Sequence, residues 1–133
     1  MISTVSVRPE ELQDDELKLI VEYCNNCWKP FPIEDVIRRV SSGKACIYRV
    51  VNEQVKGIFI LALSDDGDLY IETVAGKGMV RNFDAVYEAI KQVAINCGFN
   101  EIYGYIGRPA LKRLYQKHTK ATPIAELYKE KLR

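Results

Sequence analysis

Apolar residues recur at helical spacing in two segments near the start of the chain. The first predicted helix begins at Pro9, where acidic residues suit the positive end of the helix dipole, and it runs to about Cys27. The apolar face of this helix consists of Leu12, Leu17, Ile20, Val21 and Cys24. Because segment 28–32 contains two prolines, it must end the first helix, and residues 33–40 predict a second, short one.

Shorter apolar runs follow and predict strands. Residues 45–51 and 55–63 are rich in apolar side chains and are separated by three polar residues, which is a hairpin-loop length. An Asp-Asp-Gly-Asp turn then leads into a third run, residues 69–74. Three such strands in sequence predict an antiparallel meander, and the alternating residues 3–7 predict an earlier strand.

The apolar period returns to that of a helix after Ala75-Gly76-Lys77-Gly78. Residues 83–94 carry an apolar face at helical spacing, and Gly98 is placed to end that helix. A further strand is expected over residues 99–106, and Gly107-Arg108-Pro109 opens another helix. The chain therefore contains one βαβ crossover.

This order of elements predicts an α+β fold, a mixed sheet made of an antiparallel meander plus one βαβ crossover and flanked by about four helices. Residues 121–132 are undecided between strand and helix. With 133 residues, 47% hydrophobic and 28% charged, the chain has ordinary globular composition and can bury a core without a disulfide or a metal. We expect a single domain over residues 1–133.

The charges balance overall but are distributed unevenly. Nineteen Lys+Arg against 18 Asp+Glu give a formal net charge of +1, which argues against nonspecific binding to nucleic acid. Acidic residues gather at 10–22 and 65–68, whereas Lys77, Arg81 and segment 108–120 concentrate positive charge. A small polyanion, or a protein with a complementary surface, fits this distribution.

Neither a membrane span nor a metal site is expected. No stretch approaches the roughly 18 apolar residues of a membrane span, and the first residues lack a secretory signal pattern, so we expect a cytoplasmic protein. Cys24 and Cys27 have CxxC spacing, but no second pair lies near them and the only histidine is remote, at position 118. We therefore expect all four cysteines, Cys46 and Cys97 included, to be buried or half-buried thiols in a reducing compartment.

Gly76-Lys77-Gly78 lies between a predicted strand and a predicted helix. The first N–H groups of a helix have no partner within it, and they bind anions such as a pyrophosphate. Glycine lets the backbone come close to such a ligand, and a lysine adds positive charge. Any glycine-containing turn from strand to helix has this pattern, so a purely structural turn is an equally good interpretation of these three residues alone.

The segment from Leu69 to His118 resembles the Gcn5-related N-acetyltransferase (GNAT) family. In that family the fourth strand leads into a pyrophosphate-binding turn of the form Gln/Arg-x-x-Gly-x-Gly/Ala, and the matching segment here is Thr73-Val74-Ala75-Gly76-Lys77-Gly78. The later Leu-Tyr-x-Lys pattern of the family is matched by Leu114-Tyr115-Gln116-Lys117. Residues 55–63 look like the third strand of the family, and the two early helices fall where its substrate-side helices lie.

The resemblance implies a protein that binds acetyl-CoA and transfers its acetyl group to an amine of a small molecule or a protein. The coenzyme pyrophosphate would bind the backbone of Val74, Ala75, Gly76, Lys77, Gly78, Met79 and Val80. Glu72 is the candidate base, acting directly or through a water, and Tyr115 is the candidate acid for the leaving thiolate. The plainer alternatives are a solvent-facing strand carboxylate for Glu72 and a tyrosine packed on the sheet for Tyr115.

The chain also departs from the GNAT pattern. Thr73 stands where Gln or Arg is usual, Arg108 stands where Asn is usual, and His118-Thr119-Lys120 replaces a Gly-Phe pair. The stretch 107–114 looks closer to small GNAT-like proteins of tailed phages. A second hypothesis is therefore a non-catalytic phage protein with a virion, assembly or host-interaction role, a phage or host protein as partner, and a place in the host cytoplasm or the phage particle.

Several further residues have two interpretations each. His118 lies three residues after Tyr115 on the same predicted helix and could reach the cleft. We interpret it instead as a surface residue near a helix end, because nothing in the spacing supplies a carboxylate to orient it. Tyr103 and Tyr105 are core or cleft residues, and Trp28 with Phe31 either line the acceptor side or anchor a loop. The basic residues that form either a solvated face or a grip on phosphates are Arg108, Lys112, Arg113, Lys117 and Lys120.

Overall fold

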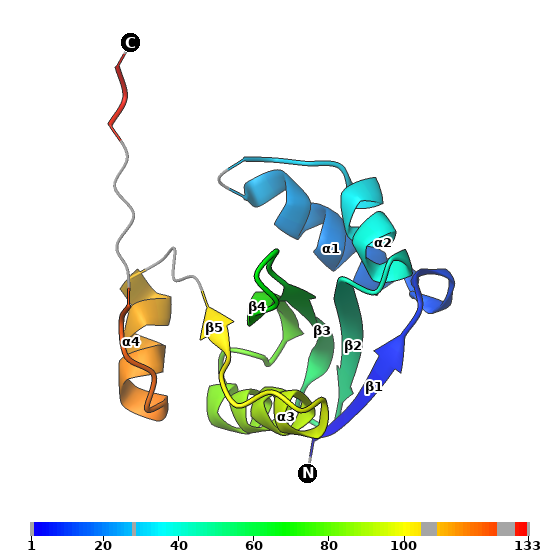
Figure 1. Cartoon of the computed structure of the whole chain (residues 1–133). Helices are drawn as coiled ribbons and strands as arrows, with labels where there is room; N and C mark the ends of the chain where they lie inside the picture. The colour runs from blue at the N-terminus through cyan, green and yellow to red at the C-terminus, as the bar shows by residue number, and fades with distance from the viewer. Residues whose placement is uncertain (1, 28, 105–108, 125–129, 133) are drawn as a thin grey trace.

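The computed structural model describes residues 2–27, 29–104, 109–124 and 130–132, and its centre is a five-stranded sheet (Figure 1). Neighbouring strands in the sheet are also neighbours in the chain. The strands are β1 (Ser3–Val7), β2 (Ala45–Val51), β3 (Lys56–Leu63), β4 (Leu69–Lys77) and β5 (Tyr103–Gly104).

The pairing of the strands confirms the predicted topology. β1 with β2, β2 with β3 and β3 with β4 are antiparallel, whereas β4 and β5 are parallel. A parallel neighbour requires the chain to cross over the sheet, and helix α3 (Phe83–Asn96) makes that crossover. The fold is therefore the expected α+β arrangement, a meander plus one βαβ unit.

The helices cover the two faces of the sheet. α1 (Asp14–Asn26) and α2 (Ile33–Ser41) lie on one face, α3 lies on the other, and α4 (Pro109–His118) lies beside β5 (Figure 1). β3 is buried on both faces, with Ile58 and Ile60 toward α1 and α2 and Phe59 toward α3. Since successive side chains of a strand alternate between faces, one apolar run in β3 supplies both halves of the core.

The first helix begins later than the sequence predicted. Residues Pro9–Glu11 form a separate 3-10 turn, Leu12 is extended, and α1 starts at Asp14. The carboxylates of Glu11 and Glu16 accept the backbone N–H groups of Arg8 and Gln13, each at 2.8 Å. Each carboxylate therefore closes its own helix start, and the predicted single helix is divided in two.

Two predicted strands have different lengths in the structure. β4 continues through Lys77 because Gly76 lies opposite Gly57, and the absence of side chains lets the two backbones approach. The strand expected over residues 99–106 is described only as Tyr103–Gly104, and residues 105 and 106 lie outside the described part of the chain. The Phe99 N–H donates to the Ala94 carbonyl at the end of α3 instead of joining the sheet.

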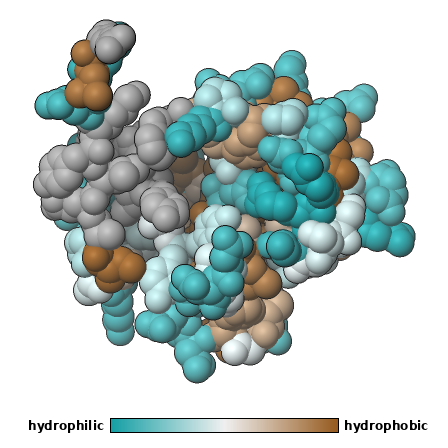
Figure 2. All heavy atoms as spheres, turned by 45° about the horizontal axis from the view of Figure 1, so that its top comes forward, coloured by the Kyte–Doolittle hydropathy of each residue, from teal (hydrophilic) through white to brown (hydrophobic). Residues whose placement is uncertain are grey.

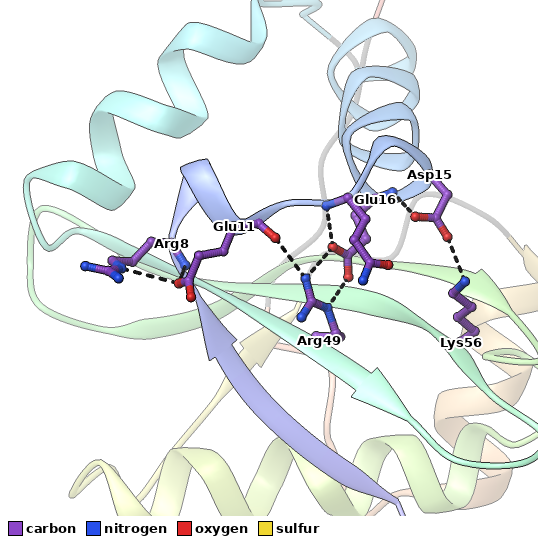
Figure 3. A network of polar contacts seen from close by, with 7 residues as sticks. Arg8, Glu11, Asp15, Glu16, Arg49 and Lys56 are labelled. Atoms are coloured by element: carbon purple, nitrogen blue, oxygen red, sulfur yellow. Dashed lines mark hydrogen bonds and ion pairs between the residues drawn. The ribbon is translucent and has the colours of Figure 1, made fainter.

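A polar network fastens the start of α1 to the sheet (Figure 3). Glu16 on α1 accepts hydrogen bonds from Arg49 on β2, from Nε at 2.6 Å and from Nη2 at 2.7 Å. Arg49 also donates to the carbonyl of Glu11, and Lys56 on β3 lies 3.3 Å from the carboxylate of Asp15. The hydrogen bonds from Arg49 lower the pKa of Glu16, so this carboxylate is charged at neutral pH.

The surface mixes residue types. On the face in Figure 2, hydrophobic and hydrophilic residues are interspersed, and exposed apolar side chains such as Val80 and Ile95 come from separate elements. Within the described ranges, no helix is long and apolar enough to cross a membrane.

Candidate functional site

The turn between β4 and α3 presents unpaired backbone donors. The Asn82 N–H donates to the Gly78 carbonyl at 3.0 Å, its side-chain amide donates to the same oxygen at 2.8 Å, and the Phe83 N–H donates to Val80 at 3.2 Å. The chain thus forms hydrogen-bonded turns from Gly78 to Phe83, just before α3. The N–H groups of Met79, Val80 and Arg81 in these turns find no acceptor among the described residues.

A hollow of about 630 Å³ lies over this turn. Lys77 and Arg81 at its rim are exposed, and neither forms an ion pair with another residue in the described segments. The residues that line the hollow are Gln54, Gly76, Lys77, Gly78, Val80, Arg81 and Asn82. Two uncompensated cations beside free backbone donors make this hollow suited to a phosphorylated anion.

The sequence analysis identified only part of this lining. Of the seven backbone positions expected to hold a pyrophosphate, Gly76, Lys77, Gly78 and Val80 line the hollow, whereas Val74, Ala75 and Met79 do not. Met79 is instead buried in the α3-side core. Arg81 and Asn82 continue the same turn and could have been included, but Gln54 comes from the β2–β3 loop and no local signal marks it.

The glycines of the turn also have a packing role that needs no ligand. Gly76 has a φ of +138°, and a Cβ there would lie 2.4 Å from the Cα of Gly57. Gly78 has a φ of +77°, and a Cβ there would lie 2.2 Å from the carbonyl oxygen of Gln54. The structure therefore supports the plainer interpretation of these glycines as well: they let β4 and the turn lie against β3 and the β2–β3 loop.

Glu72 is held at an irregularity of β4. Ile60 pairs with Thr73 and Leu61 with Ile71, so Glu72 is the extra residue of a β-bulge. Its side chain, 5% exposed, points toward α1 and α2. The interpretation of Glu72 as a solvent-facing carboxylate is therefore wrong.

Both carboxylate oxygens of Glu72 are occupied. Arg39 on α2 donates from Nη1 to Oε1 and from Nη2 to Oε2, the latter at 2.7 Å, and the Tyr23 hydroxyl on α1 donates to Oε2 at 2.7 Å. The hydrogen bonds to Glu72 raise the pKa of Arg39, while burial and the neighbouring carboxylate raise the pKa of Tyr23. Arg39 is thus a cation and Tyr23 a neutral donor at physiological pH. The sequence around Glu72 indicated neither of these two partners.

Tyr115 lies between α3 and β5. Its ring meets the rings of Phe83 and Tyr87 edge to face, with centroids 5.6 Å away in both cases. Gly104 makes room for its hydroxyl, since a Cβ on Gly104 would lie 2.8 Å from that oxygen. Burial raises the pKa of Tyr115 to about 12, so the phenol is protonated and can act as a donor at neutral pH.

His118 has a carboxylate partner that the sequence analysis missed. Its Nδ1 lies 2.5 Å from Oδ1 of Asp84 in the first turn of α3, and its ring packs against Phe83. The expected position near a helix end is confirmed, since His118 is the last residue of α4. The expectation that no carboxylate orients it was wrong, because the two residues are brought together only when α4 packs on α3.

The remaining expectations have mixed outcomes. The described basic residues of α4 and the segment after it are exposed, which agrees with a solvated face, while Arg108, Trp28 and Tyr105 lie outside the described residues. Phe31 packs edge to face on Tyr23, with ring centroids 5.7 Å apart.

Cys24 is buried and Cys27 half-buried as expected, but Cys46 and Cys97 are exposed. In the parts of the chain that the structure describes, no cluster of three or more metal-binding side chains occurs.

The fold, but not the sequence, is similar to known proteins. No protein-family profile and no curated protein sequence matches the chain. Among solved structures, AAC(6')-Iy in complex with the bisubstrate analogue CoA-S-monomethyl-acetylneamine superposes with a TM-score of 0.62 at 10% identity, covering 98% of this chain and 99% of that one.

Two further acetyltransferases give similar values. The aminoglycoside acetyltransferase meta-AAC0020 from an uncultured soil metagenomic sample, in complex with sisomicin, has a TM-score of 0.63 at 12% identity and covers 99% of this chain and 97% of its own. The ribosomal-protein-alanine N-acetyltransferase of Brucella melitensis has a TM-score of 0.65 at 9% identity, with 97% and 98% covered. The chain therefore has the fold of the GNAT acetyltransferases over almost its entire length.

Proposed function

We propose that this protein is an N-acetyltransferase that binds acetyl-CoA at the hollow over the β4–α3 turn. The observation that carries the proposal is the pair of unpaired N–H groups of Val80 and Arg81, two residues that line the hollow, beside the cations Lys77 and Arg81. These donors suit the pyrophosphate of the coenzyme. A solved structure of the same fold is a complex with a coenzyme A bisubstrate analogue, which supports the choice of ligand.

The proposed reaction needs few groups. The lone pair of the acceptor amine attacks the thioester carbonyl carbon, the carbon–sulfur bond breaks, and coenzyme A leaves as a thiolate. Tyr115 is the proposed acid, since its neutral phenol can give a proton to the thiolate and recover one from water. Because Tyr115 also packs against Gly104, it would have a structural role as well as a chemical one.

Glu72 is the proposed base. Because Arg39 and Tyr23 already occupy both of its oxygens, a proton from the amine reaches it more readily through a water than by direct contact. The acceptor is proposed to be an amine-bearing small molecule or protein, and structures of the same fold include aminoglycoside and ribosomal-protein-alanine acetyltransferases. Use of acetyl-CoA agrees with the cytoplasmic location expected from the sequence.

The experiment is a transfer assay with acetyl-CoA and three classes of acceptor: sisomicin, a polyamine and a peptide with a free N-terminus. Mass spectrometry of the acceptor detects the added acetyl group. Tyr115→Phe should reduce product formation roughly 100-fold or more, the usual contribution of a general acid. Tyr48→Phe is the matched control and should leave the rate unchanged, because Tyr48 of β2 stacks on Phe59 of β3 and does not line the hollow.

An unchanged rate in Tyr115→Phe would contradict the role of that phenol. Failure of the wild-type protein to bind acetyl-CoA would contradict the enzyme and favour the second hypothesis, a non-catalytic phage protein with a virion, assembly or host-interaction role. No described contact favours that second role, and no structural neighbour named above supports it.

A further inference from the structure

The only histidine of the chain is fixed between two helices. Its Nδ1 lies 2.5 Å from Oδ1 of Asp84, which belongs to the first turn of α3, while His118 itself is the last residue of α4. The His118 side chain is 22% exposed, whereas that of Asp84 is 67% exposed. The contact is thus partly shielded from water on the histidine side and open to water on the carboxylate side.

Ring contacts surround this pair. Phe83 packs on His118 with centroids 6.0 Å apart, on Tyr115 at 5.6 Å and on Tyr87 at 5.7 Å. His118 follows Tyr115 by three residues, so the two side chains lie on the same side of α4 and both face α3. Because contacts between rings tolerate a range of offsets, the directional contact between the described side chains of α3 and α4 is the one between Asp84 and His118.

The carboxylate end of this contact adjoins the candidate coenzyme site. Asp84 follows Asn82, which lines the hollow, and Arg81, whose N–H is unpaired among the described residues. The other end lies one helical turn from Tyr115. The pair therefore joins the turn that would hold the pyrophosphate to the helix that carries the candidate acid.

We propose that Asp84 and His118 are positioning residues that lock α4 onto the first turn of α3 and so place the Tyr115 hydroxyl over the end of the coenzyme. This inference rests on the proposed function. Neither residue is proposed to touch the substrate or to transfer a proton in the reaction.

The contact has a chemical signature of its own. A neutral imidazole carries its proton on either Nδ1 or Nε2, and the hydrogen bond that the ring makes decides which. With the Asp84 carboxylate 2.5 Å from Nδ1, the neutral ring of His118 must keep its proton on Nδ1 to donate to that carboxylate. A histidine that merely packs at a surface has no such preference imposed on it.

The test uses the full chain, and the single histidine makes its ring signals unambiguous. Nitrogen-15 correlation spectra of the His118 ring, recorded at a pH where the ring is neutral, report which nitrogen carries the proton. Hydrogen exchange of α4, followed by mass spectrometry, reports whether the helix stays packed. The variants are Asp84→Ala, Asp84→Asn, whose amide oxygen can still accept a hydrogen bond, and Glu88→Ala as the matched control.

Glu88 is a suitable control because it is a carboxylate one turn further along α3 that pairs with Lys91 of the same helix, at 2.7 Å. The wild-type ring should carry its proton on Nδ1. Asp84→Ala should shift the proton toward Nε2, speed exchange of α4 about tenfold and lower the rate of acetyl transfer roughly 10- to 100-fold, since a small misplacement of a reacting group costs this much. In Asp84→Asn the proton position, the exchange of α4 and the transfer rate should stay close to those of the wild type. Glu88→Ala should change none of these three properties.

Two results would overturn the proposal: a wild-type ring with its proton on Nε2, or an Asp84→Ala protein whose α4 exchange and transfer rate match those of the wild type. The thermal shift produced by acetyl-CoA separates this outcome from failure of the proposed function. Asp84→Ala should keep a shift in the wild-type range, because the N–H groups of the turn remain. A wild-type protein that shows no shift would contradict the acetyltransferase itself and leave the ring and exchange results to decide the role of the pair in packing.

Discussion

Arg39 on α2 donates two hydrogen bonds to the carboxylate of Glu72, the extra residue of the bulge in β4. The pair joins the helical layer to the strand that leads into the candidate coenzyme site. The Glu72 side chain is 5% exposed and that of Arg39 is 28% exposed, so the ion pair is largely removed from water.

Removing the cation should therefore destabilise the fold. We predict that Arg39→Met lowers the free energy of unfolding by about 3 kcal/mol, because it leaves the buried carboxylate with the Tyr23 hydroxyl but without its cation. Adding Glu72→Gln to the same chain should recover part of the loss, since a neutral amide costs less to bury. Urea denaturation measures both variants. Arg38→Met is the control, because Arg38 pairs with Asp35 at the exposed surface, and an equal loss in that control would contradict the account.

The Glu16–Arg49 ion pair predicts how stability depends on pH. Hydrogen bonds from Arg49 lower the pKa of Glu16 below its ordinary value of 4.5 in the folded protein. The stabilisation is therefore complete above about pH 4.5 and is lost as the pH falls through the lowered pKa. Between about pH 6 and pH 3, the free energy of unfolding should fall less in Glu16→Gln than in the wild type, as measured by denaturation. Glu53→Gln, in an exposed loop, should keep the wild-type slope, and identical slopes in all three proteins would refute the assignment.

The glycines differ in what their substitution should cost. Gly67 has a φ of +86°, and no atom lies within 4 Å of the place where a Cβ would be, so Gly67→Ala should lose only the backbone cost of about 1–2 kcal/mol. Gly78→Ala adds a contact of 2.2 Å with the Gln54 carbonyl and should lose at least about 1 kcal/mol more. Denaturation curves of the two variants test this, and equal losses would mean that the turn does not lie against the β2–β3 loop.

Thiol accessibility separates the exposed cysteines from the buried one. Cys46 and Cys97 are exposed, whereas Cys24 is buried and burial raises the pKa of its thiol to about 11. We predict that a thiol alkylating agent at neutral pH modifies Cys46 and Cys97 first and Cys24 only on unfolding. Mass spectrometry of timed samples identifies the modified residues. Early modification of Cys24 in the folded protein would show that α1 does not pack as described.

The order of the elements could be predicted because each element is indicated by a pattern within its own segment of the sequence. β3 is one continuous apolar run, α3 carries an apolar stripe at helical spacing, and Gly98, with a φ of +91°, ends α3 as expected. The division of the first predicted helix could not be seen, since it depends on Glu11 and Glu16 each bonding back to a backbone N–H. The residues after Gly98 were misjudged because Phe99 is apolar enough for a strand but packs under α3.

The candidate site could be predicted only where it is continuous in sequence. The turn after β4 was found from its glycines and lysine, but Gln54 on another loop was not. In the same way Glu72 and Tyr115 were singled out, while their partners Arg39, Tyr23 and Gly104 come from distant elements. Nothing in the sequence around Glu72 indicated that α1 and α2 bury its side chain.

Thermal unfolding with and without acetyl-CoA tests the central claim most directly, because it asks whether the hollow over the β4–α3 turn holds the coenzyme. Ligand at about 100 times its dissociation constant should add about 2.7 kcal/mol, which raises Tm by several degrees in a domain of this size. Val80→Glu should abolish the shift, since it places a carboxylate at the unpaired N–H groups, whereas Ile95→Glu, at an exposed position near the end of α3, should keep it. A wild-type protein whose Tm does not move at millimolar acetyl-CoA would contradict the account.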